Sequence, residues 1–210
     1  MYNKTSILDD VFLCFSNPEN MENGALDIIP HDLYMDMLVT YRKRVNMKNH
    51  TVTFPCFSID FADEDSEKNL FEIAKKNTGR MFKPVLYSLE EVVENIPQVS
   101  GTRNLLADDS EDYDGHGIFV LTNDDGRFGA VWIMYENVMK DVADKIGRNF
   151  YILPSSVHEL ILLTDYGCSS AEELKNMVVD INKTVVDTTD KLSDSIYYYN
   201  SLTYTITKVA

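Results

Sequence analysis

Short apolar runs bounded by turn-forming residues limit the folds open to this chain of 210 residues. Residues 11–15 form one such run, which Asn17-Pro18 ends, and residues 118–122 form another, which the turn sequence 123–127 follows. Runs of this kind are typical of buried strands. None approaches the roughly 18 apolar residues that a membrane-spanning helix needs. Other segments have helical periodicity, so the sequence predicts an α+β fold of mainly antiparallel hairpins or meanders packed by about five helices.

The predicted strands pair mostly with their neighbours along the chain. Pro55 lacks a backbone N–H, which places its segment at a sheet edge or a bulge. Ser156 and Glu159 could instead cap a helix, which leaves an alternative for one segment. Hairpins are expected for 11–15 with 25–29, for 118–122 with 128–135, and for 196–199 with 202–209. The remaining strand segments are 51–59, 150–153 and 157–163.

Apolar residues at helical spacing and capping patterns predict the helices. Ser88 to Glu91 is a capping-box pattern that opens one of them, and Gly147 is expected to end another. The helical segments are 33–45, 70–77, 89–96, 136–147 and 171–181. Basic residues in the last turn of the first helix suit the helix dipole better than they suit a phosphate site. These are Arg42, Lys43, Arg44 and Lys48.

The length of the chain fits one hydrophobic core, so residues 1–210 are expected to form a single compact unit. A change of composition at the polar, acidic loop 98–116 suggests a subdivision. It would separate an N-terminal α/β half, residues 1–97, from a C-terminal α+β half, residues 117–210.

The charge of the chain is strongly negative, with 34 acidic residues against 19 basic ones and a formal net charge of −15. Such a field disfavours direct binding to nucleic acid or to an anionic membrane and favours a basic protein partner. Cys14, Cys56 and Cys168 form no CxxC pair, and the N-terminus carries acids before its apolar run, so a cytoplasmic location is expected. The oligomeric state is left open.

Two carboxylate runs are the candidate partner-binding sites. The first contains Asp60, Asp63, Glu64, Asp65 and Glu67, and the second contains Asp108, Asp109, Glu111, Asp112 and Asp114. An EF-hand alignment of the second run fails, because Leu121 would stand where a bidentate Glu is required. A solvated acidic loop is the favoured interpretation, with a loose calcium site as the alternative.

Catalytic chemistry has one candidate segment, Pro154 to Glu159. Its residues Ser155, Ser156, His158 and Glu159 could belong to a hydrolase or a metal-assisted enzyme, although catalytic triads are normally assembled from distant segments. The zinc-peptidase pattern HExxH is incomplete, because Leu162 replaces the second His. The chain has no glycine-rich nucleotide motif, and its histidines lack metal-ligand spacing, so no cofactor and no metal are expected.

Several segments of the second half resemble a known family. They are LFEIAKKNTGRMF (70–82), GIFVLTN (117–123), GAVWIMYENVMKDVADKIG (129–147), NFYILPSSVHELILL (149–163), AEELKNMVVDIN (171–182) and LSDSIYYY (192–199). This order is similar to that of an uncharacterised domain-of-unknown-function family of gut clostridia (Firmicutes), whose members often lie on mobile genetic elements. The resemblance covers about residues 64–200, and residues 1–63 match less clearly. It implies a bacterial or mobile-element origin and supplies no catalytic residues.

Two functional hypotheses follow from these observations. The favoured one is a non-enzymatic acidic protein that binds a basic partner, as an inhibitor or as a decoy that mimics nucleic acid. The alternative is a hydrolase or metal-assisted enzyme centred on residues 154–159.

Overall fold

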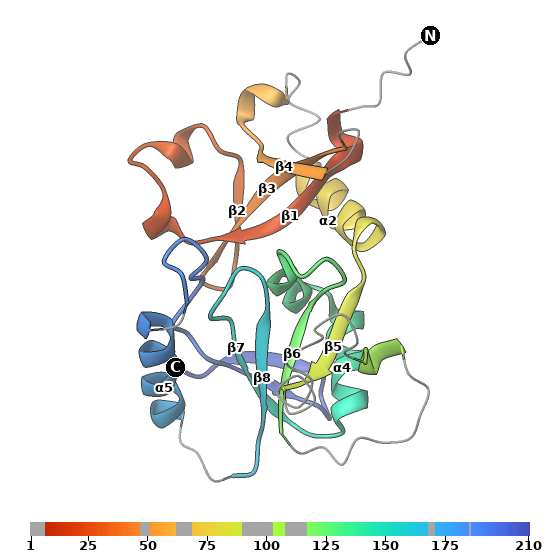
Figure 1. Cartoon of the computed structure of the whole chain (residues 1–210), viewed down its shortest axis with the longest axis vertical. Coiled ribbons are helices and arrows are strands. Elements are labelled where there is room, and N and C mark those ends of the chain that lie inside the picture. The colour runs from red at the N-terminus through yellow and green to blue at the C-terminus, as the bar shows by residue number, and fades with distance from the viewer. Residues whose placement is uncertain are drawn as a thin grey trace. The chain divides into compact units, whose positions relative to one another are not determined.

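The chain divides into two compact units, Met1–Lys83 and Pro84–Ala210 (Figure 1). The structure, a computed structural model, describes residues 7–46, 51–61, 69–89, 103–107, 117–167, 171–184 and 186–210. The predictions of a single unit and of a division at the loop 98–116 stay predictions.

Unit 1 contains a four-stranded antiparallel sheet around its longest strand, β3 (Met37–Asn46). Strand β1 (Val11–Ser16) pairs with one edge of β3. Strands β2 (His31–Tyr34) and β4 (Thr51–Pro55) pair in tandem with its other edge. Val11 to Phe15 are buried without alternation, because α2 and β3 enclose β1. The position of β4 at a sheet edge confirms the prediction from Pro55, but the strand ends at Pro55 instead of continuing to residue 59.

Helix α2 (Leu70–Met81) closes the outer edge of β1 with polar side chains. The Thr78 hydroxyl accepts a hydrogen bond of 2.9 Å from the Leu13 N–H, and the Asn77 amide donates one of 2.9 Å to the Val11 carbonyl. Phe82, directly after α2, packs edge-on against Phe12 with ring centroids 5.1 Å apart. The edge groups of β1 are therefore satisfied inside the unit, which protects the strand from pairing with other chains.

Two predictions in unit 1 are wrong. Residues 33–45 form the β2–β3 hairpin instead of a helix, with Met35 at a φ of 56° in the two-residue turn. The apolar spacing misled because β3 is buried on both faces from Met37 to Tyr41, and such a run can imitate a helical stripe. Residues 25–29 are not a strand, because Gly24 at a φ of 82° turns the chain into the short 3₁₀ helix Ala25–Asp27.

Unit 2 contains a six-stranded antiparallel sheet in the order β10-β9-β7-β8-β6-β5, of which Figure 1 labels β5 to β8. Its strands are β5 (Pro84–Ser88), β6 (Ile118–Asn123), β7 (Phe150–Leu153), β8 (Leu160–Thr164), β9 (Tyr197–Asn200) and β10 (Thr205–Lys208). Leu86, Leu121 and Leu160 lie side by side across three strands and are fully buried. They form the centre of the core.

Helical segments cover both faces of this sheet. The 3₁₀ helix η7 (Gly129–Met134) packs on β6 and β8, and α4 (Glu136–Ile146) packs on η7. On the other face, Leu174 and Val178 of α5 (Ala171–Thr184) pack with Leu153. Gly147 ends α4 in the left-handed region, as predicted, and α2, α4 and α5 confirm three predicted helices.

The predicted hairpin of 118–122 with 128–135 is wrong. Residues 129–134 form η7, all six of them buried, and β6 instead pairs with β8 and with β5, which sequence reasoning missed. Gly129 explains the turn, because a Cβ there would lie 2.5 Å from the Thr122 Cα and 2.7 Å from the His158 carbonyl oxygen. Only glycine allows this backbone approach.

The other predictions for unit 2 are confirmed in part. The final hairpin and the strand at 150–153 are confirmed, whereas the strand predicted at 157–163 begins only at Leu160. The predicted helix 89–96 lies outside the described residues apart from Leu89. The fold is therefore α+β and mainly antiparallel, with three α-helices in the described parts of the chain. No described helix has both the length and the apolar character that crossing a bilayer requires.

Candidate functional site

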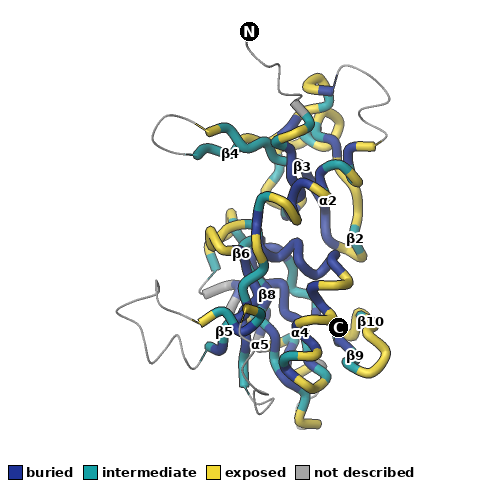
Figure 2. Tube along the Cα trace, turned by 90° about the vertical axis from the view of Figure 1, so that its right-hand side faces the viewer, coloured by how far each residue is buried: buried dark blue, intermediate teal, exposed yellow. Residues whose placement is uncertain are grey.

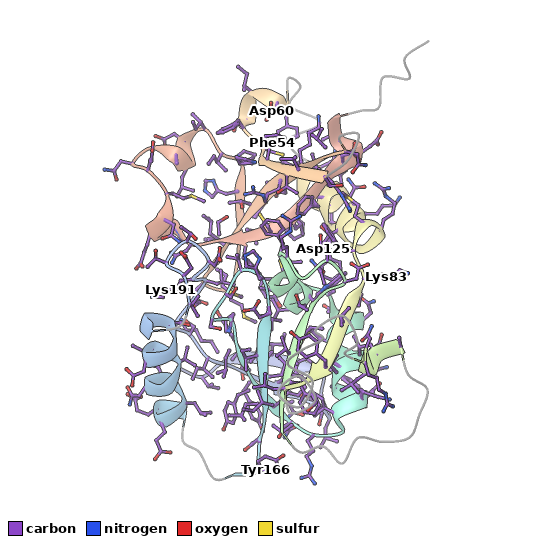
Figure 3. All side chains as sticks on the ribbon, in the orientation of Figure 1. Phe54, Asp60, Lys83, Asp125, Tyr166 and Lys191 are labelled. Atoms are coloured by element: carbon purple, nitrogen blue, oxygen red, sulfur yellow. The ribbon has the colours of Figure 1, made fainter. Side chains whose placement is uncertain are left out.

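The candidate catalytic segment, residues 154–159, connects β7 to β8 as an irregular bend. Residues 190–193 hold it in place. The Leu192 N–H donates to the Ser155 carbonyl at 2.9 Å, and the Val157 N–H donates to the Asp190 carbonyl at 2.9 Å. Lys191 of residues 190–193, labelled in Figure 3, forms a β-bridge with Ser156 of the bend. Both serines are buried, so this bend is an integral part of the unit.

His158 joins the segment to two other parts of unit 2. Its Nδ1 accepts a hydrogen bond of 3.2 Å from the Phe128 N–H, so the neutral ring carries its proton on Nε2. The Nε2 atom lies 3.4 Å from Oδ1 of Asp190. The His158 carbonyl accepts bonds from the Thr122 hydroxyl and the Gly129 N–H, both at 2.8 Å. The imidazole therefore fixes the turn before η7 to the turn that contains Asp190.

Glu159 and Ser156 lie beside this imidazole. Burial raises the pKa of Glu159, whereas a hydrogen bond from the Ser156 hydroxyl and the charge of His158 oppose the rise and Asp190 adds to it. The Ser156 Oγ also accepts a bond of 3.0 Å from the His158 N–H. Burial raises the pKa of Tyr87, and the negative charge of Glu159 adds to this rise. The residues Ser156, His158, Glu159, Asp190 and Phe128 are called the His158 junction here.

The chemistry of the His158 junction is that of a hydrogen-bonded connection. Both ring nitrogens of His158 face partners, the Phe128 N–H and the Asp190 carboxylate, and the Ser156 hydroxyl bonds Glu159 and the backbone. In the contacts of the described residues, the imidazole is not paired with a hydroxyl as a catalytic dyad requires. The enzyme hypothesis stays a prediction.

Metal and thiol chemistry have little support in the described ranges. No group of three or more His, Cys, Asp or Glu side chains among them could hold a metal ion. Cys14 and Cys56 are buried free thiols. Burial raises the pKa of both and takes that of Cys56 to about 12, so neither is a reactive thiolate at neutral pH.

A groove of about 690 Å³ lies in unit 1 between α2 and the residues before β1. Its polar groups have structural partners: Arg80 donates to the Asp9 carbonyl at 2.6 Å, and Asn77 donates to the Leu8 carbonyl at 2.7 Å. The lining therefore serves the attachment of α2 to β1. It consists of Leu8, Asp9, Asp10, Ile73, Lys76, Asn77 and Arg80.

Of the predicted partner-binding carboxylates, Asp60 lies in the part of the chain that the structure describes. This residue is exposed, and its Oδ2 accepts a hydrogen bond of 2.8 Å from the Phe57 N–H (Figure 3). The other nine lie outside the described residues. They are Asp63, Glu64, Asp65, Glu67, Asp108, Asp109, Glu111, Asp112 and Asp114.

Sequence reasoning missed a wider acidic region of unit 1, formed by residues 17–36 and 51–61, of which it had named Asp60 alone. These segments contain six carboxylates and no Lys or Arg. The Ser58 N–H donates to the Ile28 carbonyl at 2.8 Å, which joins the two segments. The carboxylates belong to Glu19, Glu22, Asp27, Asp32, Asp36 and Asp60. The absence of Lys and Arg from the two segments is the sequence signal that could have revealed this acidic region.

The same two segments expose apolar side chains. Of the eleven large apolar residues exposed in the described parts of the chain, seven lie here, and Figure 2 shows β2 as an exposed strand. Exposed apolar groups gathered with charges are typical of interaction sites. The seven are Leu26, Ile28, Leu33, Met35, Phe54, Phe57 and Ile59. Together with the six carboxylates they are called the acidic-apolar surface here.

Comparison with known proteins identifies the family of this chain. Neither the curated proteins nor the solved structures give a match. One family model matches residues 15–201, which include the whole acidic-apolar surface and the whole His158 junction. The chain therefore belongs to the family of unknown function DUF5688.

Proposed function

We propose that this protein is a non-enzymatic interaction protein that binds a basic protein partner through the acidic-apolar surface. The observation that carries the proposal is the composition of that surface: six carboxylates and seven exposed large apolar residues lie in two segments that contain no Lys or Arg, although Lys43 of β3 pairs with Phe54 at one border. A basic partner would meet no like charge from these two segments. Carboxylates would steer it into place, and the apolar groups would supply the buried contact area.

The net charge of −15 supports the same function at longer range. A field of this sign attracts a basic protein and repels phosphate backbones, so the partner is a protein rather than a nucleic acid. The finer proposal is an inhibitor or decoy that occupies the nucleic-acid site of a basic protein, in an accessory or anti-defence role on a bacterial mobile element. The resemblance to a clostridial family motivates that role. The carboxylate runs at 60–67 and 108–114 would extend the contact.

Affinity capture with matched variants tests the proposal. The wild-type protein, immobilised and exposed to host lysate, is expected to retain a basic protein that a salt gradient releases. Conversion of Glu19, Glu22, Asp27 and Asp36 to the corresponding amides should lower the salt concentration needed for release. The matched control neutralises four exposed carboxylates of unit 2, namely Glu136, Asp141, Glu172 and Asp180.

The outcomes separate a specific surface from general acidity. Weaker retention by the first variant alone supports the acidic-apolar surface as the binding site. Equal weakening by both variants would mean that only total charge matters. Retention of no basic protein, or release that is indifferent to salt, would overturn the proposal.

The alternative function, a hydrolase or metal-assisted enzyme, has one supporting observation. The Asp190 carboxylate lies 3.4 Å from the His158 imidazole, and hydrolases orient a catalytic imidazole in a comparable way. Catalysis would require the imidazole to leave Asp190 or Phe128 and reach a hydroxyl or a water. Substrate screening of the wild type against His158→Ala tests it, and activity that the variant lacks would support the enzyme.

A further inference from the structure

The sheet edges of the molecule differ in how their backbone groups are satisfied. In unit 1, Thr78 and Asn77 bond the edge of β1. In unit 2, the Asn104 amide closes the edge of β5, because it accepts from the Leu86 N–H at 3.1 Å and donates to the Pro84 carbonyl at 3.2 Å. Closure by side chains is a common protection against unwanted strand pairing.

The outer edge of β2 has no comparable closure among the described residues. Tyr34 and Met37 flank a two-residue turn, so they form a hydrogen-bonded pair, and the alternation of antiparallel pairing turns the Leu33 N–H and C=O away from β3. The Leu33 side chain is 72% exposed. The backbone and the side chain of Leu33 are thus both presented to solvent.

We infer that the free edge of β2 is the docking site for the basic partner, which adds an extended segment of alternating apolar and basic residues as a further strand. This inference rests on the proposed function and names its binding mode. Strand addition to an exposed sheet edge is a recurrent mode of peptide recognition, in which main-chain hydrogen bonds supply affinity and alternate side chains supply specificity.

The side chains of β2 explain the alternating pattern. Neighbouring residues of a strand point to opposite faces, so Leu33 lies on one face and Asp32 on the other. The Tyr41 hydroxyl donates a hydrogen bond to the Asp32 carboxylate and holds it in position. Burial raises the pKa of Tyr41, and this contact adds to the rise. An added strand would place an apolar residue beside Leu33 and a Lys or Arg beside Asp32.

Charge argues against a second copy of this chain as the occupant. Two copies would bring together surfaces whose two segments contain only acidic charge, and like charges at an interface cost free energy. Two other edge strands are weaker candidates. Strand β10 carries exposed threonines and Lys208, a protective pattern for an edge strand. Strand β4 ends at Pro55, which has no N–H to donate, and its Thr53 carbonyl accepts a hydrogen bond of 3.3 Å from Arg42. Complementarity therefore favours a basic segment at β2.

Binding of synthetic peptides to the full chain tests the inference. The probe is a short peptide of alternating Lys and Val, and two comparison peptides match its charge: one alternates Lys and Ser, and the other is the Lys–Val peptide with N-methylated backbone amides at the pairing edge. We expect the Lys–Val peptide to bind at least about tenfold more tightly than either, by calorimetry at low salt. Leu33→Ser should remove this preference.

The control variant is Leu202→Ser, which removes an apolar side chain of 87% exposure from unit 2 and should leave the preference intact. Circular dichroism verifies that both variants are folded. Equal binding of all three peptides, unchanged by Leu33→Ser, would overturn strand addition and leave the proposed function standing. Failure of every cationic peptide to bind would overturn both. Dimerisation of the chain alone, abolished by Leu33→Ser, would assign the edge to a second copy and overturn the inference.

Discussion

The His158 junction and the acidic-apolar surface both concentrate functional groups, but they use them in different ways. In the junction, the Ser156 hydroxyl bonds the half-buried Glu159 carboxylate, the His158 imidazole faces Asp190, and both the hydroxyl and the imidazole accept hydrogen bonds from the backbone of unit 2. On the acidic-apolar surface, Ile28, Leu33 and Ile59 are more than half exposed and lie among carboxylates. The first arrangement is typical of groups that hold a fold together, and the second of groups that contact another molecule. Substitutions in the two regions should therefore affect different properties.

The largest expected effect is on stability, from Gly129→Ala beside the junction. The new Cβ would lie 2.5 Å from the Thr122 Cα, a backbone atom that cannot move alone, so overpacking should cost about 3 kcal/mol. Urea denaturation measures this loss. Gly126→Ala is the control, because its Cβ would meet nothing within 4 Å and it carries only the strain of a φ of 72°, about 1 kcal/mol. Equal losses in the two variants would contradict the close packing at Gly129.

His158→Ala should destabilise the protein by about 1–2 kcal/mol. The reason is that the Phe128 N–H loses its acceptor and a partly buried ring is removed. The free energy of unfolding from urea denaturation is the readout. His31→Ala, at an exposed histidine of β2, should cost much less. A stable His158→Ala protein that has lost a measurable catalytic activity would instead make the junction an active site.

Glu159→Gln should stabilise the protein at neutral pH. The folded-state pKa of Glu159 is raised above its ordinary value of 4.5, so the folded state binds the proton more tightly than the unfolded state does. Stability from this group is complete below pH 4.5 and is lost as the pH rises through the folded-state pKa. The amide removes that loss, and the advantage should disappear in acid.

Urea unfolding of the wild type and of Glu159→Gln, from below pH 4.5 to neutral pH, checks the prediction. A second readout is the pKa of Tyr87, which should fall in the variant because the Glu159 charge, which adds to the effect of burial on this pKa, is gone. A variant that is less stable than the wild type at neutral pH would show that the ionised carboxylate makes a favourable contact.

The smallest effect on stability is expected at the acidic-apolar surface. Leu33→Ser should change the free energy of unfolding by less than about 0.5 kcal/mol, since a side chain that is 72% exposed contributes little to the core. The same substitution should reduce partner or peptide binding. A large loss of stability would show that Leu33 supports the fold, as the residues of the His158 junction do, and would contradict the difference between the two regions.

Prediction from sequence succeeded where local signals agreed. Helices α4 and α5 have an apolar stripe together with a cap or a stop signal, and both form where expected. The segment 33–45 has the stripe and basic residues at its end, but it has no capping pattern and no glycine stop, and its spacing also suits a central strand buried on both faces. Residues 129–134 form a continuous apolar run, which periodicity cannot assign to a strand or a helix. The close approach permitted by Gly129 decided that case.

The candidate site depended even more on tertiary structure. Asp190 meets His158 because the chain segment after α5 bonds to the bend at 154–159, a contact that no local pattern encodes. The lack of Lys and Arg over residues 17–36 is visible in the sequence, whereas the exposure of Leu33 follows from an edge position that the predicted helix concealed. Edges and distant contacts are properties of pairing, so they become visible only when the strand order is known.

The closure of β1 by α2 has a consequence for protein synthesis. Thr78 follows Leu13 by 65 residues, so the ribosome releases the apolar β1 segment well before the helix that protects its edge. During this interval, Val11 to Phe15 form an unprotected apolar segment of the kind that aggregates or recruits chaperones. Translation pauses between residues 16 and 78 would lengthen the interval, and rapid elongation through this region would shorten it.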